Sequence, residues 1–203
     1  MNVNIKRLSP DAQIPQYAHA SDACFDLVAA EDVVIEPGET ALVKTGLAFE
    51  IPEGYEMQIR PRSGITLKTK LRVQLGTVDA GYRGEVGVIV DNIAPVIYRT
   101  IKDDEGERYE PLTSKVLYDV RQRFVPTING DHIDGTYIIR KGDRIAQAVI
   151  KPIEQAVFTE VAELGDSDRG AGGFGSSGVI AESYEKANER NGDALERLAK
   201  EDE

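Results

Sequence analysis

The segment Arg60–Ile65 brings a charged, a hydroxyl-bearing and a flexible residue together within a few positions. Arg62 offers a positive charge, Ser63 a hydroxyl, and Gly64 lets a ligand approach the backbone closely. Pro61 ends a strand just before them, and this combination suits recognition of a phosphate group where a strand passes into a helix. An ordinary capped turn explains the segment at least as well when it is taken alone.

A second candidate spans Gly76–Glu85, where three glycines in ten residues are flanked by apolar runs and predict a β-hairpin. Asp79 and Tyr82 are three positions apart and could face the same ligand. A carboxylate there could accept a proton from an attacking water, and an aromatic ring could pack on a sugar. A functional loop and a simple turn are equally compatible with this segment.

Two further segments place single polar residues among apolar neighbours. In Gly142–Ile150 the alternation predicts a strand in which Gln147 shares a face with Ile145 and Val149. A polar side chain in that position needs a partner, either a ligand or a backbone group. Asp26 alternates with apolar residues in the same way and could hold a carboxylate near a site.

The last candidate is the glycine- and serine-rich segment Arg169–Gly178. Its free backbone N–H groups could wrap a phosphate chain, with Arg169 adding charge. Flexible linkers have the same composition, so a linker is the alternative reading. Phe174 argues against a linker, because a linker has no need of an aromatic ring. A ring that becomes ordered over a bound base would make the segment a lid.

The elements that must position these residues are short. Apolar runs such as Val33–Ile35 and Leu47–Ile51 end at turns that contain proline and glycine, a pattern typical of an antiparallel sandwich or barrel. We expect one short turn of helix after Ser63. Residues 92–141 mix short apolar runs with a charged stretch, and the Asn-Gly pair at 129–130 predicts a hairpin turn. The polar end of the chain suits a frayed helix or disorder.

Composition narrows the classes of protein. At 203 residues the chain forms one domain, or one domain with a large insertion. A net charge of −11 argues against a general nucleic-acid surface, although a few local arginines and N–H groups are enough to bind one nucleotide. No apolar run approaches the roughly 18 residues of a membrane span. Cys24 is the only cysteine, so no intrachain disulfide forms and a reducing cytoplasm fits best. We therefore expect neither nucleic acid nor a membrane as a partner.

Taken together and in this order, five segments resemble the five motifs of the trimeric dUTPase family, over roughly residues 3–92 and 138–178. The resemblance implies an all-β jelly-roll fold that closes only as a homotrimer, with active sites at subunit interfaces. It also implies hydrolysis of dUTP to dUMP and pyrophosphate, which limits uracil in DNA and supplies dUMP. The five segments are Asp22–Ala30, Arg60–Ile65, Gly76–Gly87, Gly142–Ala148 and Arg169–Gly178.

By position, the resemblance implies three catalytic residues. Asp79 would activate the water that attacks the α-phosphorus, and Gln147 would bind the α-phosphate or this water. Ser63 would contact the phosphate chain, in a region ordered by Arg62 and Asp26. Mg²⁺ is expected on the three phosphates and on water, with no direct protein ligand and with Asp26 reaching it at most through water.

The resemblance also implies how the base, the sugar and the terminal phosphate are bound. Main-chain groups of Gly76–Gly87 would hold uracil, and Tyr82 would exclude a ribose 2′-hydroxyl. Arg169 would pair with the γ-phosphate, and Phe174 would stack on uracil. The strand Leu71–Leu75 departs from the Asn-Ser-Pro of many relatives, which leaves the details of the uracil pocket open. The implied substrate-binding set is Arg62, Ser63, Gly64, Gly76, Thr77, Asp79, Tyr82, Gly87, Gln147, Arg169, Phe174, Gly175, Ser176 and Ser177.

The resemblance divides the chain into parts. A β core comprises residues 1–92 and 138–164, a flexible Gly-rich lid arm comprises 165–178, and an acidic tail comprises 179–203. Residues 93–137 form an insertion that resembles the one in dUTPases of staphylococcal phages, a subfamily whose members also bind a repressor. A repressor protein bound through residues 93–138 is therefore an expected second partner, in a bacterial host cytoplasm if a phage encodes the chain.

Three other classes of function stay open at this point. A dCTP deaminase has the same fold, but it would need its own catalytic glutamate and would release ammonia in place of pyrophosphate. The chain could instead be chiefly a protein-binding regulator. A purely structural β-module is the third class, and it leaves one combination of residues unexplained: Asp79, Tyr82, Gln147, Arg169 and Phe174.

Overall fold

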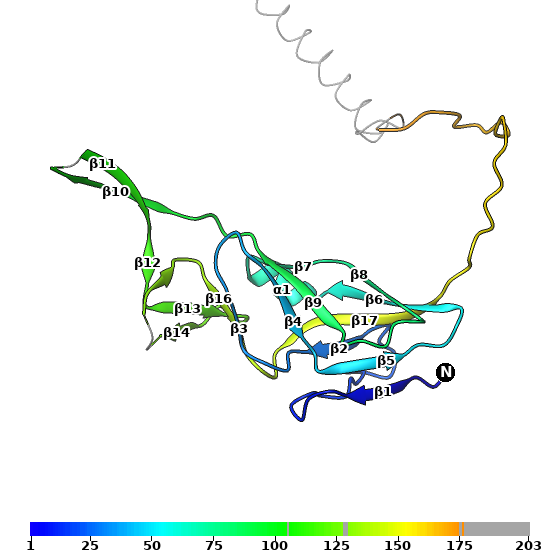
Figure 1. The fold of residues 1–203 in the computed structure, drawn as a ribbon, viewed down its shortest axis with the longest axis horizontal. Coiled ribbons are helices and arrows are strands. Elements are labelled where there is room, and N and C mark those ends of the chain that lie inside the picture. The colour runs from blue at the N-terminus through cyan, green and yellow to red at the C-terminus, as the bar shows by residue number, and fades with distance from the viewer. Residues whose placement is uncertain (105, 128–129, 175, 177–203) are drawn as a thin grey trace, which may run out of the picture. The chain divides into compact units, whose positions relative to one another are not determined.

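The computed structural model describes residues 1–104, 106–127, 130–174 and 176 (Figure 1). The chain divides into two units, Met1–Ala156 and Val157–Glu203. Several residues named above lie outside the described ones: Asn129 of the expected hairpin turn, Gly175, Ser177 and Gly178 of the expected lid, and the tail 179–203.

The described part of the first unit consists of strands and one short helix, which confirms the predicted all-β class. Ten strands lie outside the stretch 93–139: β1 Asn4–Arg7, β2 Phe25–Val28, β3 Val33–Ile35, β4 Thr40–Lys44, β5 Leu47–Glu50, β6 Tyr55–Pro61, β7 Leu71–Val73, β8 Gly76–Asp79, β9 Gly87–Asn92 and β17 Arg144–Pro152. Seven lie within that stretch: β10 Tyr98–Asp103, β11 Gly106–Pro111, β12 Thr113–Ser114, β13 Val116–Asp119, β14 Phe124–Pro126, β15 His132–Ile133 and β16 Tyr137–Ile139.

Two sheets supply most of the core. One has the strand order β2-β17-β6-β8 and the other has the order β4-β9-β7. Alternation explains why these strands form. In β6, Met57 and Ile59 are buried between half-buried neighbours, and in β9, Val88 and Val90 are buried on either side of an exposed isoleucine. Side chains from both sheets belong to one hydrophobic cluster, as face-to-face packing of two sheets requires.

The predicted turn of helix follows the end of β6. Helix α1, Ser63–Lys68, begins directly after Arg62, whose backbone is extended. Ile65 is its buried residue, and the N–H of Thr69 donates to the Ile65 carbonyl at 2.9 Å, which ends the helix. Because α1 starts where β6 stops, Arg62 and Ser63 lie at a strand-to-helix junction, as predicted.

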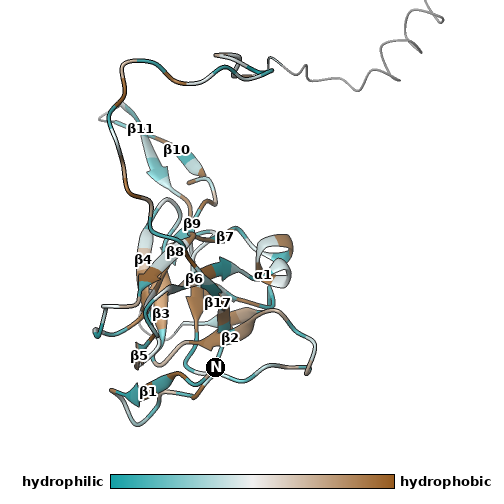
Figure 2. Cartoon of the chain, turned by 90° about the vertical axis from the view of Figure 1, so that its right-hand side faces the viewer, coloured by the Kyte–Doolittle hydropathy of each residue, from teal (hydrophilic) through white to brown (hydrophobic). Residues whose placement is uncertain are grey.

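The stretch between β9 and β17 has two differently packed parts. β10 and β11 form a two-stranded ribbon, Tyr98–Pro111, which projects from the core and is mostly hydrophilic (Figures 1 and 2). β13 and β16 instead join β3 in a sheet of order β14-β13-β16-β3. Tyr137 and Ile139 of β16 belong to the core cluster. This second part is therefore continuous with the β core.

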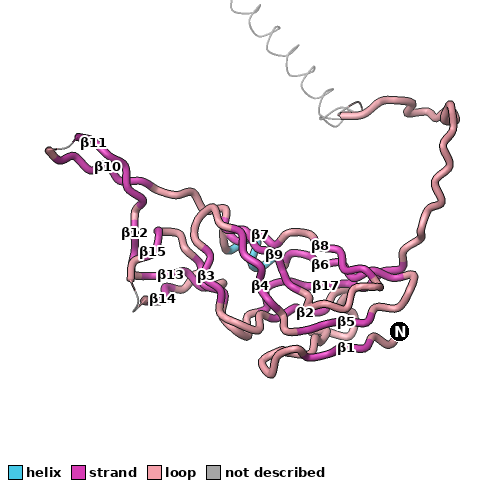
Figure 3. Tube along the Cα trace, in the orientation of Figure 1, coloured by secondary structure: helices cyan, strands magenta, loops and turns pink. Residues whose placement is uncertain are grey.

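The described residues of the second unit, 157–174 and 176, form turns and irregular chain without a strand or helix (Figure 3). Within this unit the Nε of Arg169 donates to the Gly172 carbonyl at 2.7 Å. Apolar side chains such as Phe158 and Leu164 are almost fully exposed. Across all described residues, no helix is long and apolar enough to cross a lipid bilayer.

Candidate active site

A cleft of about 970 Å³ opens where β6 passes into α1. Segments of β2, of α1 and of the beginning of β17 line it, so three of the five predicted segments meet here. The predicted site residues among its walls are Asp26, Arg62, Ser63, Gly64 and Gln147. The other lining residues are Ala18, His19, Asp22, Ala23, Cys24, Ile65, Lys68, Val120, Arg121, Gly142, Asp143 and Arg144.

Asp26 lies between two arginines at this cleft. Its Oδ1 is 2.9 Å from Nε of Arg62, and its Oδ2 is 3.2 Å from Nη1 of Arg144. The Nη1 of Arg62 also donates to the Arg144 carbonyl at 2.9 Å. Since the Asp26 side chain is only 18% exposed, one largely buried carboxylate fixes two guanidinium groups in the cleft wall. Such groups are well suited to a phosphate ligand.

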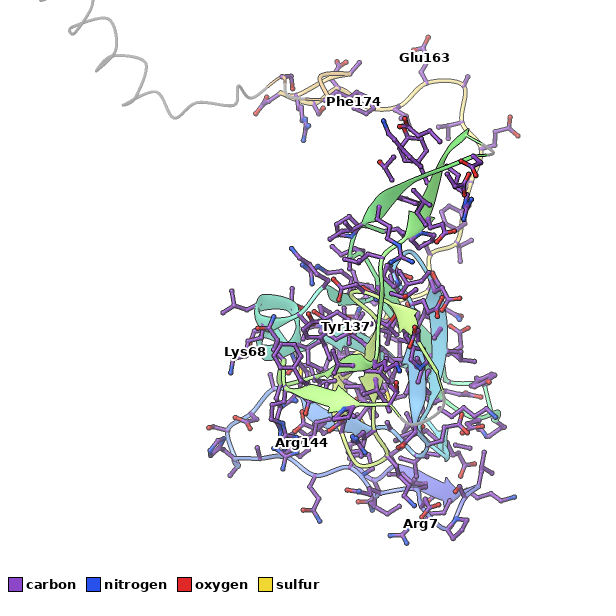
Figure 4. The ribbon with its side chains drawn as sticks, turned by 90° about the vertical axis from the view of Figure 1, so that its left-hand side faces the viewer. Arg7, Lys68, Tyr137, Arg144, Glu163 and Phe174 are labelled. Atoms are coloured by element: carbon purple, nitrogen blue, oxygen red, sulfur yellow. The ribbon has the colours of Figure 1, made fainter. Side chains whose placement is uncertain are left out.

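Three cationic residues of the cleft were not among the predicted site residues: Lys68, Arg121 and Arg144. Arg144 lies within the predicted segment Gly142–Ala148, and its position at the start of the strand is the sequence signal that could have identified it as a site residue. Lys68 is the last residue of α1, and only the position of the helix brings it to the cleft. Figure 4 shows the side chains of Lys68 and Arg144 on the same side of the core.

Gln147 has the backbone partner that one of the two interpretations of its position expects, and its role toward a ligand stays a prediction. In β17 it pairs with Asp26 of β2 and with Arg60 of β6. Its Nε2 donates to the Pro61 carbonyl at 2.9 Å, which is the backbone partner expected of a core glutamine. The side chain nevertheless lines the cleft, and this is its one hydrogen bond found with the described residues. Its second N–H can therefore donate to an anion, and its Oε1 can accept a hydrogen bond from a water.

Asp79, the predicted general base, is in β8 and lies beside the beginning of β6, far from the end of β6 at which the cleft opens. β8 pairs with β6 so that Asp79 is opposite Glu56, whereas the cleft begins beyond Pro61. At 3.3 Å per residue, this length of strand corresponds to roughly 17 Å. Within one chain, the predicted general base and the predicted phosphate site are therefore far apart. The predicted residues absent from the cleft walls in the first unit are Gly76, Thr77, Asp79, Tyr82 and Gly87.

The segment that carries these residues is not the predicted β-hairpin. β8 and β9 enter different sheets, and residues 80–86 cross between them. We call these residues the crossing loop. The hairpin prediction was wrong because closely spaced glycines allow both a tight reversal and a crossing between sheets. The choice between the two depends on which distant strands are available for pairing.

In the crossing loop, the Tyr82 ring lies against Gly84. The N–H of Tyr82 donates to the Asp79 carbonyl at 3.0 Å, and the Tyr82 hydroxyl donates to the Glu85 carbonyl at 2.9 Å. A Cβ at Gly84 would lie 2.4 Å from the Tyr82 hydroxyl oxygen, which is too close for non-bonded atoms. The glycine therefore allows the ring to adopt this position. Asp79, just before the loop, is exposed while Val78 is buried.

The remaining predicted residues belong to the second unit. Arg169, Phe174 and Ser176 are described only within that unit, where Phe174 is fully exposed. Their assignment to the γ-phosphate, to uracil and to phosphate contacts stays a prediction.

The fold and the cleft define a class of protein. An all-β sandwich with arginines, a serine and an amide at one cleft is suited to binding a phosphate-bearing ligand. The sequence profile described as dUTPase matches residues 10–103 and 132–178. The chain belongs to the dUTPase family. The stretch between the two matches, 104–131, lies within the predicted insertion.

Relatives in bacteria match most of this chain. The deoxyuridine 5′-triphosphate nucleotidohydrolase of Thermobifida fusca is 43% identical over 189 residues, which are 92% of this chain and 84% of the relative. The enzyme of the same name from Nautilia profundicola is 42% identical over 180 residues, 88% of this chain and 99% of the relative.

Solved structures of phage proteins share the fold. Staphylococcus bacteriophage 80alpha dUTPase with dUPNHPP matches with a TM-score of 0.76 at 37% identity, over 88% of this chain and 99% of that one. The dUTPase of phage phi11 of S. aureus, described for its species-specific insert, gives 0.70 at 34% identity over 81% and 98%. A variant of the phi11 protein coordinates a structural Mg(II) ion. Phage dUTPases are described as controlling the transfer of virulence genes.

Proposed function

We propose that this dUTP nucleotidohydrolase builds each active site from more than one copy of its chain. The observation that carries the proposal is the separation of roughly 17 Å between Asp79 and the start of the cleft along β6. A general base must come within about 3 Å of the water that it activates. Asp79 therefore cannot act on a phosphorus held beside Ser63 and Gln147 of its own chain. Asp79 of a neighbouring copy can.

An apolar pair on the outer face of the second sheet supports self-association. Leu42 of β4 and Ile89 of β9 are cross-strand partners, and they are 58% and 47% exposed. Their neighbours Val43 and Val88 point into the core. Apolar side chains gathered on an exposed sheet face are typical of an interaction surface. We propose that the homotrimer implied by the family buries this pair.

The side chains at the cleft suit cleavage between the α- and β-phosphates. A water oriented by the Asp79 carboxylate attacks the α-phosphorus, and its proton passes to that carboxylate. The bond from the α-phosphorus to the bridging oxygen breaks, so that pyrophosphate leaves with the bonding electrons. Arg62 and Arg144 offset the charge that develops, while Ser63 and Gln147 hold the phosphate chain in line.

The donors at the cleft suit a metal carried by the substrate. Both oxygens of Asp26 pair with arginines, and among the described residues no three His, Cys, Asp or Glu side chains gather as a metal site. The Mg²⁺ on which dUTPases generally depend would, when bound to the triphosphate, neutralise part of the charge on the leaving pyrophosphate. In this proposal Asp26 positions Arg62 and Arg144 and reaches the ion at most through water.

The sugar and base would be selected by other segments. Tyr82 of the crossing loop would face the deoxyribose, with uracil held by the main chain of Gly76–Gly87. From the second unit, Arg169 and Phe174 would close over the γ-phosphate and the base, together with the serines of the same arm. These roles rest on position within the family motifs.

Substrate assays test the activity directly. Pyrophosphate release should be measured with dUTP, dTTP, dCTP and UTP in parallel, and only dUTP should be turned over efficiently. Ammonia release from dCTP would favour the deaminase of the same fold. No turnover of any nucleotide would leave only a binding role.

Subunit complementation tests the shared site. Asp79→Asn and Ser63→Ala should each lower turnover by ~10²-fold or more while the trimer forms. If one copy supplies the cleft and another supplies Asp79, trimers mixed from equal amounts of the two variants contain about one intact site in four. Mixing should then restore about a quarter of the wild-type rate. Mixed trimers that stay as inactive as the separate variants would show that both residues act within one chain.

We also propose a second role, protein binding through residues 93–138. The ribbon supports it, because Tyr98 and Tyr109 are 58% and 67% exposed. Its charged side chains pair with one another, as in the contacts Lys102–Glu107 and Arg99–Glu110. Exposed tyrosines beside arginines are typical anchors of protein interfaces. A repressor-type protein is the partner that the likeness to the phage dUTPases favours.

A further inference from the structure

The stretch 93–139 reaches the cleft at one tight turn. Val120 and Arg121 follow β13 and line the cleft together with Arg62, Ser63 and Lys68. They lie within 104–131, the residues that the family profile leaves unmatched. The turn therefore brings a residue of the insertion to a site built otherwise from the core.

A nearly buried carboxylate fixes this turn. Asp119 is 3% exposed, and its Oδ1 accepts the backbone N–H groups of Arg121 and Arg123 at 2.8 and 2.9 Å. Its Oδ2 accepts Nε of Arg123 at 2.7 Å. Gln122 has a φ of 62°, in the left-handed region that favours glycine. Strain of this kind persists where the surroundings enforce a geometry, and it often marks a functional turn.

The Arg121 side chain is the exception among the arginines of this stretch. Arg99 and Arg108 form ion pairs within the ribbon, and Arg123 pairs with Asp119. The exposed side chain of Arg121 makes no ion pair or hydrogen bond with the described residues. An arginine held at a cleft by a fixed backbone, with its guanidinium free, is prepared to bind an anion.

The net charge of the cleft depends on Arg121. Four cationic side chains oppose three anionic ones, which leaves a single excess positive charge when His19 is neutral. Without Arg121 the net charge of the side chains that line the cleft would be zero, and a neutral cleft is poorly suited to binding a polyphosphate. The cations are Arg62, Lys68, Arg121 and Arg144, and the anions are Asp22, Asp26 and Asp143.

We propose that Arg121 is a further substrate-binding residue, which binds the phosphate chain of dUTP from the insertion. The proposal rests on the proposed function, because it takes the cleft to be the phosphate site. The insertion then serves nucleotide binding as well as any protein partner. Occupation of the cleft by a triphosphate would hold the turn after β13 in place.

Binding of the non-hydrolysable analogue dUpNHpp tests the proposal. Arg121→Ala should weaken binding ~10-fold, the scale of one charge-assisted hydrogen bond. Arg121→Lys should recover part of the loss, because it keeps the charge. Inhibition by deoxyuridine, which has no phosphate, should stay unchanged in both variants. Arg99→Ala is the matched control, since Arg99 is paired in the ribbon and does not line the cleft.

The outcomes separate this proposal from the proposed function. An Arg121→Ala protein that folds, forms trimers and binds dUpNHpp within twofold of wild type would overturn the role of Arg121, while the hydrolase activity stands. Equal losses for dUpNHpp and deoxyuridine would also overturn it, because the damage would then be structural. Failure of the wild-type protein to release pyrophosphate from dUTP would instead contradict the proposed function.

Discussion

At Gly84 the absence of a side chain leaves room for the Tyr82 ring, whose hydroxyl bonds to the Glu85 carbonyl. If this ring faces the sugar, its position decides whether a 2′-hydroxyl collides with it. Selectivity for deoxyribose would then depend on a glycine that need not touch the substrate.

Gly84→Ala tests this dependence. We expect it to lower the preference for dUTP over UTP in the same direction as Tyr82→Ala, because a Cβ at 2.4 Å must displace the ring. The readout is kcat/KM for the two nucleotides. Gly81→Ala is the control, since a Cβ there meets no atom within 4 Å. Unchanged selectivity in Tyr82→Ala would assign the sugar gate to another residue.

Asp119 is a second residue whose neighbours decide its behaviour, because they set the pKa of its carboxyl group. Burial alone would raise its pKa, but hydrogen bonds from Arg123 and Arg121 outweigh burial and hold the pKa below its usual value. A carboxyl group of this kind stabilises the fold above its unfolded pKa of ~3.9. It loses that contribution as the pH falls through the lower folded value.

The pH dependence of thermal unfolding should show this contribution. We expect Asp119→Asn to lower stability at neutral pH by about 1.5–3 kcal/mol, the scale of hydrogen bonds to a charged group. The difference from wild type should shrink as the pH falls below about 4, where the carboxyl of the unfolded chain takes up a proton, and should be lost once the pH passes through the lower pKa of the folded state. Asp104→Asn, at an exposed position in the ribbon, should match wild type. A difference that stays constant down to low pH would contradict the assignment.

Among the elements, the ribbon and the rest of the insertion differ in whether they form part of the β core. The N–H of Leu112 donates to the Ile97 carbonyl at 2.7 Å, so the two ends of the ribbon are adjacent. β13 and β16, by contrast, continue the sheet that contains β3. Removal of the ribbon should therefore leave the core intact, whereas removal of all of 93–138 would take buried Tyr137 with it.

We expect replacement of residues 98–111 by a short turn to leave trimer formation and dUTP turnover within about twofold of wild type, since surface loops tolerate such changes. Binding of a repressor-type protein, measured by titration, should be lost. Tyr98→Ala combined with Tyr109→Ala, in the full-length protein, separates side-chain contacts from loop length. If the shortened protein loses the trimer or its turnover, the ribbon is structural.

At the scale of the whole molecule, Met1–Ala156 forms a unit of its own. We expect truncation after Leu164 to leave the melting temperature and the trimer unchanged. Turnover of dUTP should fall at least ~10-fold, because Arg169 is deleted and a charged hydrogen bond contributes about 1.5–3 kcal/mol. Phe174→Ala alone should cost less, since one stacked ring contributes on the order of 1 kcal/mol. Full activity of the truncated protein would exclude a lid.

The sequence by itself determined the features that depend on neighbouring residues. Alternation in Tyr55–Pro61 and Arg144–Pro152 predicted strands, because side chains of a strand point to opposite faces. The proline and glycine around Ser63 predicted the junction between strand and helix, which is present. The resemblance of the five segments identified the family, since the order of motifs is a property of the sequence.

Only the tertiary structure decided which distant residues meet. It placed Asp26 between Arg62 and Arg144, sent β8 and β9 into different sheets, and brought Arg121 to the cleft. Propensity and alternation act over a few residues, and an arginine has the same local sequence signal whether its guanidinium is paired or free. Ion pairs, sheet partners and cleft walls depend instead on the packing of the whole core, which brings together residues that are far apart in the chain.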